Sequence, residues 1–212
     1  MKKIGAMDIA TTTGLCFCDG EKFEAIAFRP SEKRPFGLKK GEIDFAYEGR
    51  LFSNFRNYAR SWLVENQITD LGIERPLQSN VTIKKPIYDT SSKWAGTAVT
   101  YKEVGGTTMA TIFRIYGLVA AAVETCARLG VTVHMISQGE WRSAFLGVTR
   151  APRGTKDGTI WLKNKTIDQC RLIGLNDLTA DMADSVGICW TLRARLNPRL
   201  AGHTEDLFRK KY

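Results

Sequence analysis

Apolar and polar residues alternate along the first part of the chain, a pattern that is typical of β-strands. Within residues 3–10, Ala6 and Asp8 fall on one face of the predicted strand, and the residues between them fall on the other. Two further runs follow at residues 14–18 and 23–28, and an Asp-Gly pair separates them, as in the tight turns of β-hairpins. The first part of the chain therefore predicts three consecutive antiparallel strands.

Beyond residue 41, apolar residues recur at steps of three and four, which indicates amphipathic helices. Helices are predicted over residues 42–67, 108–129, 159–173 and 179–196, and another begins at the capping-box sequence Ser137-Gln138-Gly139-Glu140. Short strands are predicted at residues 69–74 and 131–136. Residues 75–106 follow neither period, so we expect a long irregular loop there, of the kind that usually carries a function.

The order of these elements defines an α/β fold. Three antiparallel strands, followed by strands that are reached through helical crossovers, predict a mixed five-stranded sheet with helices on both faces. This is the element order of the ribonuclease H-like fold. We expect residues 1–196 to form a single domain of this fold with an inserted loop at about residues 78–106, and residues 197–212 to form a basic C-terminal extension.

Composition and charge narrow the class of partner. The 212 residues are 43% hydrophobic and 25% charged, as in globular chains, and their net charge of +9 favours nucleic acid as a partner. The longest uninterrupted apolar run, residues 115–123, is shorter than the ~20 residues of a membrane span. A carboxylate lies within the first eight residues, unlike a secretory signal. We therefore expect a cytoplasmic protein that has no membrane partner.

Potential zinc ligands are few and scattered. The five cysteines form no Cys-x-x-Cys pair, and His134 and His203 are the only histidines. We expect no zinc site. The cysteines are predicted to be reduced core residues, and His134 is predicted to lie in the core or at an interface.

Four carboxylates stand where this fold would bring them together. Asp8 and Glu74 end two strands that are predicted to be parallel neighbours at the centre of the sheet, so both side chains reach the same edge. Asp181 and Asp184 share one face at the start of the last helix, for which Thr179 is the expected N-cap. Each acid taken singly is equally typical of a turn or a helix end. Their convergence favours Mg²⁺ or Mn²⁺, because clustered buried carboxylates need a cation.

Three short motifs resemble those of the RuvC-type Holliday junction resolvases: Met-Asp-Ile-Ala-Thr-Thr-Thr-Gly at 7–14, Gly-Ile-Glu-Arg-Pro at 72–76 and Thr-Ala-Asp-Met-Ala-Asp-Ser at 179–185. The resemblance implies that the catalytic and metal-binding residues are Asp8, Glu74, Asp181 and Asp184, with a basic residue from either Lys163 or Lys165. It also implies a structure-selective DNA endonuclease that resolves four-way junctions or other branched DNA as a homodimer, for which the helix at 108–129 offers an apolar surface. Two ions would support phosphodiester hydrolysis, with Asp8 bridging them.

Basic residues suited to DNA binding fall in two segments. The segment that leads to the last helix contributes Arg142, Arg150, Arg153 and Lys156, which suit contacts to phosphates. The inserted loop contributes basic residues interleaved with aromatic ones, a mixture that suits unpaired or distorted DNA: Lys84, Lys85, Lys93, Trp94, Tyr101 and Lys102. The alternative for the first segment is a merely solvated basic loop, and the alternative for the inserted loop is a packing role for Trp94 and Tyr101.

Three other functions fit parts of the sequence. One is a less specific ribonuclease H-like nuclease that acts on flaps, duplexes or RNA. Another is an ATP-binding domain, because residues 8–14 also resemble the phosphate-binding hairpin of the actin and sugar-kinase class, although that class needs two such cores. The third is a DNA-binding protein without activity. Metal-dependent cleavage would distinguish the nucleases from the other two.

Overall fold

The central element of the structure is a mixed five-stranded sheet. The computed structural model describes residues 3–39, 41–76, 83–89, 98–104 and 107–198, with side chains described outside 77–106. The strands of the main sheet are β1 (Ile4–Asp8), β2 (Thr13–Cys18), β3 (Phe23–Phe28), β4 (Asp70–Glu74) and β7 (Thr132–Ile136). Their order is β3-β2-β1-β4-β7, with antiparallel pairs among the first three strands and parallel pairs from β1 to β4 and from β4 to β7. The predicted sheet is confirmed.

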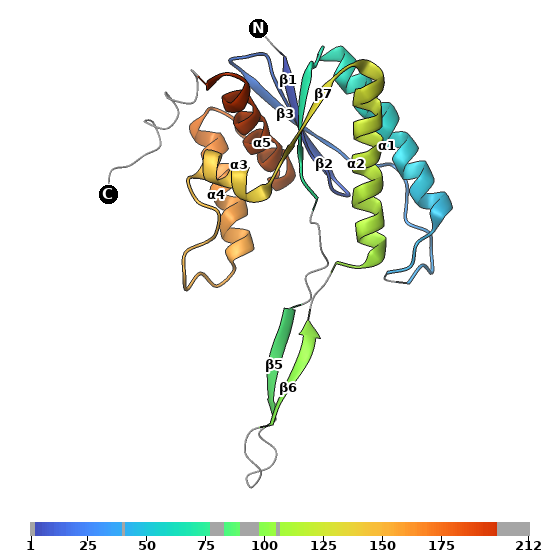
Figure 1. Ribbon diagram of the computed structural model, residues 1–212, viewed down its shortest axis with the longest axis vertical. Coiled ribbons are helices and arrows are strands. Elements are labelled where there is room, and N and C mark those ends of the chain that lie inside the picture. The colour runs from blue at the N-terminus through green and yellow to red at the C-terminus, as the bar shows by residue number, and fades with distance from the viewer. Residues whose placement is uncertain (1–2, 40, 77–82, 90–97, 105–106, 199–212) are drawn as a thin grey trace, which may run out of the picture.

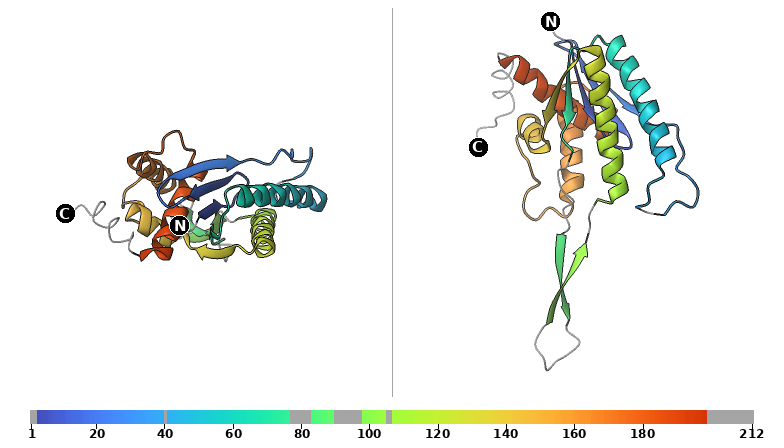
Figure 2. Two further views of the ribbon diagram at one scale, coloured as in Figure 1. Left: turned by 90° about the horizontal axis from the view of Figure 1, so that it is seen from above. Right: turned by 45° about the vertical axis from the view of Figure 1, so that its right-hand side comes forward.

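In the described parts of the chain, five helices cover the two faces of this sheet, as predicted (Figure 1). One face carries α1 (Phe45–Glu65) and α2 (Met109–Leu129), and the other carries α3 (Gln138–Leu146), α4 (Gly158–Leu172) and α5 (Ala180–Leu196). The view from above in Figure 2 shows the same three layers, with the sheet in the middle. The fold is therefore a three-layer α/β arrangement in which parallel strands are joined by helices.

The two-residue period of β1 decides which side chain enters which core. Ile4 and Ala6 pack with α3, α4 and α5, whereas Met7 and Ile9 pack with α1 and α2. Asp8 continues the side of Ile4 and Ala6 and is the last residue of the strand. The same alternation that builds the core thus delivers a carboxylate to the α5 side of the sheet edge.

Local sequence signals fix the starts of the helices around that edge. Ser137 and Glu140 form the reciprocal capping box expected at the start of α3. Thr179 caps α5 by accepting a hydrogen bond from the backbone N–H of Met182, and Gly130 ends α2 in the left-handed conformation. These helix ends were predicted to within one residue, because each has a residue type with a specific capping role.

Helices α1 and α2 form a closely packed pair. Glu48 is buried, with 1% of its surface exposed. Its two carboxylate oxygens accept hydrogen bonds from the Arg114 Nε at 3.1 and 3.0 Å. The backbone of Gly117 lies so close to Phe52 that an added Cβ would be 2.2 Å from its ring. By length and hydropathy, α2 is the one helix of the described parts that is long and apolar enough to cross a membrane. Its Leu118 and neighbouring residues are instead part of the core shared with α1.

The expected irregular loop contains a β-hairpin, so that prediction was wrong. Strands β5 (Ile83–Asp89) and β6 (Ala98–Val104) pair in an antiparallel two-stranded sheet that projects from the main body (Figure 2). Its sequence lacks a clean apolar alternation because charged residues and a proline interrupt it. Lys84 and Lys85 lie on β5, and Tyr101 and Lys102 lie on β6, with side chains that are not described. Lys93, Trp94 and residues 199–212 of the expected C-terminal extension lie outside the described residues.

Candidate functional site

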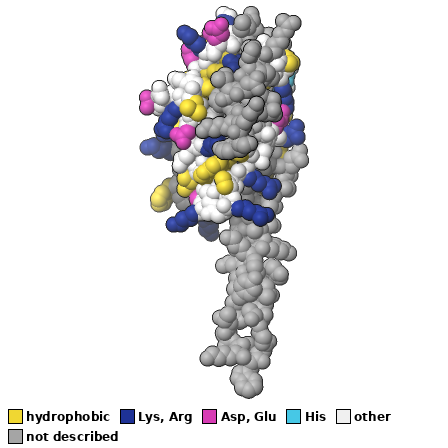
Figure 3. Space-filling view, turned by 90° about the vertical axis from the view of Figure 1, so that its left-hand side faces the viewer, with side chains coloured by type: hydrophobic (Ala, Val, Ile, Leu, Met, Phe, Trp, Pro, Cys, Tyr) yellow, Lys and Arg dark blue, Asp and Glu magenta, His cyan; other side chains and the backbone are white. Residues whose placement is uncertain are grey.

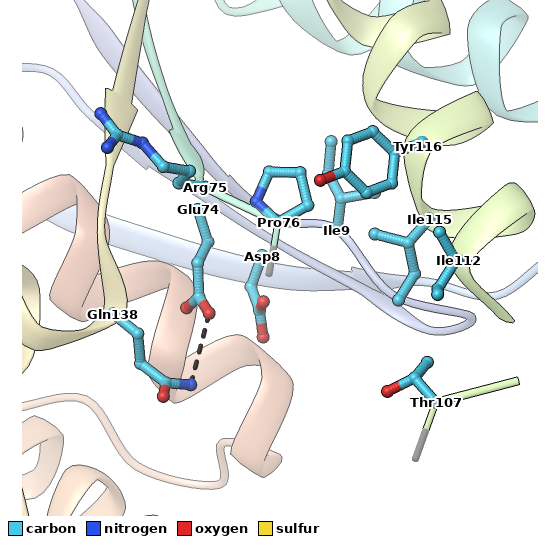
Figure 4. A pocket seen from close by; sticks show the side chains of 10 residues that line it. All are labelled: Asp8, Ile9, Glu74, Arg75, Pro76, Thr107, Ile112, Ile115, Tyr116 and Gln138. Atoms are coloured by element: carbon cyan, nitrogen blue, oxygen red, sulfur yellow. Dashed lines mark hydrogen bonds between the residues drawn. The ribbon is translucent and has the colours of Figure 1, made fainter. Parts of the chain in front are cut away.

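Asp8 and Glu74 stand beside each other at the carboxyl ends of two central strands. β1 and β4 are parallel, with Ala6 opposite Gly72 and Met7 opposite Ile73, so the next residues along both strands reach the same edge. Figure 4 shows the two carboxylates side by side and pointing to the same side. The sequence predicted that Asp8 and Glu74 reach the same edge of the sheet, and the structure places them there.

The first turn of α5 is pressed against the sheet next to Asp8. Gly14 pairs with Asp8 across the antiparallel ladder of β1 and β2. A Cβ at Gly14 would lie 1.9 Å from the backbone oxygen of Asp181 and 3.0 Å from the backbone nitrogen of Met182. Only a glycine lets the helix approach this closely. Gly14 therefore brings the acidic start of α5 to the strand end that carries Asp8.

Trp141 fixes the carboxylate of Glu74, and sequence reasoning missed this residue. The Trp141 Nε1 donates to Glu74 Oε2 at 2.8 Å, and the Gln138 Nε2 donates to Glu74 Oε1 at 3.4 Å. The Trp141 side chain is fully buried, and its ring packs so tightly on α5 that a Cβ at Gly187 would lie 2.6 Å from it. A buried indole N–H needs an acceptor, and this one has a carboxylate.

The acids share one electrostatic environment. Burial is the largest cause that raises the pKa of Asp8 well above its ordinary value of 3.8, and the charges of Glu74, Asp184 and Asp181 raise it further. Burial and the charge of Glu74 raise the pKa of Asp184 to about 7. Burial also raises the pKa of Glu74, although the Trp141 hydrogen bond opposes this. The four predicted carboxylates are therefore close enough to repel one another.

Two basic side chains partly offset this negative charge. Lys163 lowers the pKa of Asp8 and of Asp184, and Arg142 lowers those of Glu74 and Asp184. The Arg142 guanidinium lies over the Trp141 ring at 5.3 Å, and its buried Nε has no hydrogen-bond partner in the described part of the chain. Between the two lysines left open by the sequence, Lys163 is the one that acts on the acids, because the Lys165 ammonium lies over the Trp161 ring at 5.5 Å.

The donors fit a hard divalent cation by chemistry but do not form a preformed ligand cage. Carboxylate oxygens are the ligands that Mg²⁺ and Mn²⁺ prefer, and the mutual repulsion of these acids would be relieved by a cation. Across the described residues, no three His, Cys, Asp or Glu side chains are placed to hold one ion together. Glu74 accepts hydrogen bonds at both carboxylate oxygens, at 2.8 Å from Trp141 and at 3.4 Å from Gln138. Trp141 thus anchors one oxygen of Glu74, and binding of one ion by the whole set requires small shifts of the other side chains.

The remaining basic candidates lie away from the acids. Arg150, Arg153 and Lys156 are exposed in the connection between α3 and α4. That connection lies at the end of the body from which the hairpin projects (Figure 1), and Lys and Arg side chains gather on this end in Figure 3. These residues lie at the same end of the body as the acids, and none of them is among the groups that shift the pKa values of the acids.

The cysteines and His134 lie outside this edge. All five cysteines are free and buried, as expected of core residues. Burial raises the pKa of the Cys170 thiol to about 12, with a smaller contribution from Asp184, so this thiol is a poor nucleophile. His134 Nε2 pairs with the buried Asp70 Oδ1 at 3.0 Å, which accounts for a histidine within the central sheet.

A small pocket opens beside Asp8 and Glu74. Its volume is about 170 Å³, and its lining combines the two acids with apolar residues from the start of α2. Figure 4 shows all ten lining side chains. The complete lining is Asp8, Ile9, Glu74, Arg75, Pro76, Thr107, Ile112, Ile115, Tyr116 and Gln138.

Comparison with known proteins identifies the fold. No protein-family model and no curated protein matches the sequence. The structure is similar to RuvC of Thermus thermophilus, with 12% sequence identity and a TM-score of 0.56 over 92% of this chain and 95% of that one. It is also similar to T. thermophilus RuvC in complex with a Holliday junction substrate, with 11% identity and a TM-score of 0.55 over 93% and 97% of the two chains. The protein thus has a divergent RuvC-like fold, which confirms the fold expected from the sequence.

Proposed function

We propose that the protein is a metal-dependent endonuclease that cuts branched DNA, with a four-way junction as its substrate. The observation that carries this proposal is the convergence of Asp8, Glu74, Asp181 and Asp184 at one sheet edge, where their charges act on one another. The similarity to RuvC, one structure of which is in complex with a Holliday junction substrate, supports the choice of DNA. The net charge of +9 agrees with a polyanionic partner.

The four carboxylates would hold Mg²⁺ or Mn²⁺. A bound divalent ion supplies an activated water and neutralises the charge that develops on the phosphate during hydrolysis. The chain itself orients the acids: Gly14 seats the first turn of α5, and Trp141 fixes Glu74. Arg142 lowers the pKa of Glu74 and of Asp184, so its guanidinium supplies positive charge at the edge where a phosphate would lie.

The end of the molecule around the acids would bind the DNA backbone. Arg150, Arg153 and Lys156 are exposed on one side of this end, and the hairpin extends from it. In the register of the hairpin, Lys85 lies directly opposite Lys102. Two basic positions paired across the strands suit a polyanion bound along the hairpin.

A cleavage assay tests the proposal. We expect Mg²⁺ or Mn²⁺ to support cutting of a four-way junction faster than of a Y-shaped, linear duplex or RNA substrate, and chelation of the metal to stop it. Asp8→Asn should abolish cleavage because it removes a ligand charge without changing side-chain volume. DNA binding should survive or strengthen in this variant, because the repulsion of phosphates falls.

The matched control is Asp168→Asn on α4, where the exposed carboxylate accepts a hydrogen bond from Arg171 Nη1 at 2.8 Å. This variant should cut at the wild-type rate. Cleavage by Asp8→Asn at the rate of the control would contradict the assignment of the site. Equal cutting of the linear duplex would favour the less specific nuclease, and ATP turnover without any cleavage would favour the ATP-binding alternative.

A further inference from the structure

The pocket beside the acids has two unlike walls. Asp8 and Glu74 form one wall, whereas Ile112, Ile115 and Tyr116 from the first two turns of α2 form the other (Figure 4). The acidic wall belongs to the α5 side of the sheet edge and the apolar wall to the α2 side. The acidic wall repels an anion unless a divalent cation lies between them, so a ligand that uses both walls carries an anionic group that such a cation can bind at one end and an apolar group at the other.

We propose that this pocket binds one unstacked nucleobase of the DNA strand whose phosphate lies at the acids. This inference rests on the proposed nuclease function. A nucleotide has the required two-ended chemistry, because its phosphate is charged and its base presents a planar face for stacking. The opposite orientation is excluded, because a phosphate against Ile112 and Ile115 would lose its hydration without a compensating partner.

The size of the pocket limits the ligand to one base. At about 170 Å³ it is smaller than the ~300–1,000 Å³ of sites for drug-sized ligands, a size that suits a single base better than a base pair. The base must therefore leave its stack before it enters. Unstacking costs least where a base is already unpaired or weakly paired, as at a branch point. The pocket would thus select strands that present such a base next to the cut.

Tyr116 is the expected stacking surface. The residue is 43% exposed, although it lies next to a well-packed core, and Met109 two turns earlier on α2 is 66% exposed. The continuity of this apolar surface with Asp8 and Glu74 favours DNA over a second protein copy as its occupant. Loss of one base–aromatic stack should lower kcat/KM roughly 5- to 150-fold, with no effect on the folded core.

The first experiment removes the base and the ring separately. Wild-type protein, Tyr116→Ala and Tyr116→Phe are each assayed on a four-way junction and on the same junction with an abasic residue next to the scissile phosphate. We expect the abasic residue to slow the wild type and Tyr116→Phe, and to have little further effect on Tyr116→Ala. Val64→Ala, at a residue of α1 that is 55% exposed, is the matched control and should behave as the wild type.

Two results would overturn the base pocket. One is wild-type cleavage of the abasic junction at the normal rate. The other is a Tyr116→Ala defect of the same size on both substrates together with a change from dimer to monomer in sedimentation, which would assign the α2 surface to a second copy.

A second experiment needs no cleavage. 5-Iodouracil is placed at successive positions through the branch, bound to the uncut Asp8→Asn complex and irradiated. Crosslinking of one position to Tyr116 supports the base pocket even if the wild type proves to cut no substrate, so the two proposals fail separately. Crosslinks confined to residues outside the pocket would refute it.

Discussion

Replacement of Asp184 by asparagine should stabilise the metal-free protein at alkaline pH. The pKa of this carboxyl is raised from 3.8 to about 7, first by burial and then by Glu74, so ionisation is less favourable in the folded state than in the unfolded state. Below the unfolded-state pKa of 3.8 the carboxyl is protonated in both states and does not reduce the folding stability. As the pH rises from 3.8 to about 7, the loss of stability grows, and above about 7 it is complete. A difference of this size corresponds to about 4 kcal/mol of folding free energy at most.

The variant removes the charge and keeps the shape of the side chain. We expect its free energy of unfolding to exceed that of the wild type by about 2–4 kcal/mol at roughly pH 8, with part of the gain lost to burial of the amide. At about pH 4 the difference should nearly vanish, because the folded wild type is then protonated at this position. Urea denaturation followed by tryptophan fluorescence, with a chelator present, measures both values.

A control variant and two contrary outcomes test the prediction for Asp184. Asp168→Asn, at an exposed position, should change the unfolding free energy by no more than about 0.5 kcal/mol at either pH. An equal gain for Asp184→Asn at both pH values would show that packing, and not charge, is responsible. A loss of stability at alkaline pH would refute the repulsion inferred for the site. A divalent cation should stabilise the wild type more than the variant, because it binds the folded acids.

Two further variants test how the chain holds the acids in place. Gly14→Ala should lower the unfolding free energy by about 1–3 kcal/mol or more and abolish cleavage, because a Cβ there would displace the first turn of α5; Gly49→Ala, which has open space around it, should instead stabilise α1 by about 0.5–1 kcal/mol. Wild-type stability and activity in Gly14→Ala would contradict the close approach. Trp141→Phe should weaken divalent-cation binding roughly 10- to 100-fold in calorimetric titration, because Glu74 loses its donor, whereas Trp161→Phe should leave it unchanged.

The acidic edge could be predicted from the sequence because its parts obey local rules. Asp8 continues an alternating strand, Glu74 ends a short buried one, and Thr179 has the residue type of an N-cap. The order of strands and helices then restricts the topology to a sheet in which both strand ends meet. The approach of α5 to Gly14 needed the structure, because a glycine in a strand does not reveal what packs on it.

Other features depend on contacts between distant segments, which no local pattern encodes. Trp141 reads as an apolar core residue of a helix, and only the fold shows that its N–H meets Glu74. The choice of Lys163 over Lys165 follows from the direction of α4 relative to the acids. The hairpin was missed because its charged strands have no core to face, so the apolar alternation that marks a buried strand is absent.

The two ends of the inserted segment, residues 77–106, lie close together on the body of the protein. Pro76 and Thr107 line the same small pocket, so the chain leaves the body and returns to it at nearly one place. The entropy of closing a loop between fixed ends rises only with the logarithm of its length, so the insert can be shortened, lengthened or exchanged at little cost to the sheet. Residues 77–106 therefore form a replaceable insert, which can be exchanged without rebuilding the five-stranded sheet.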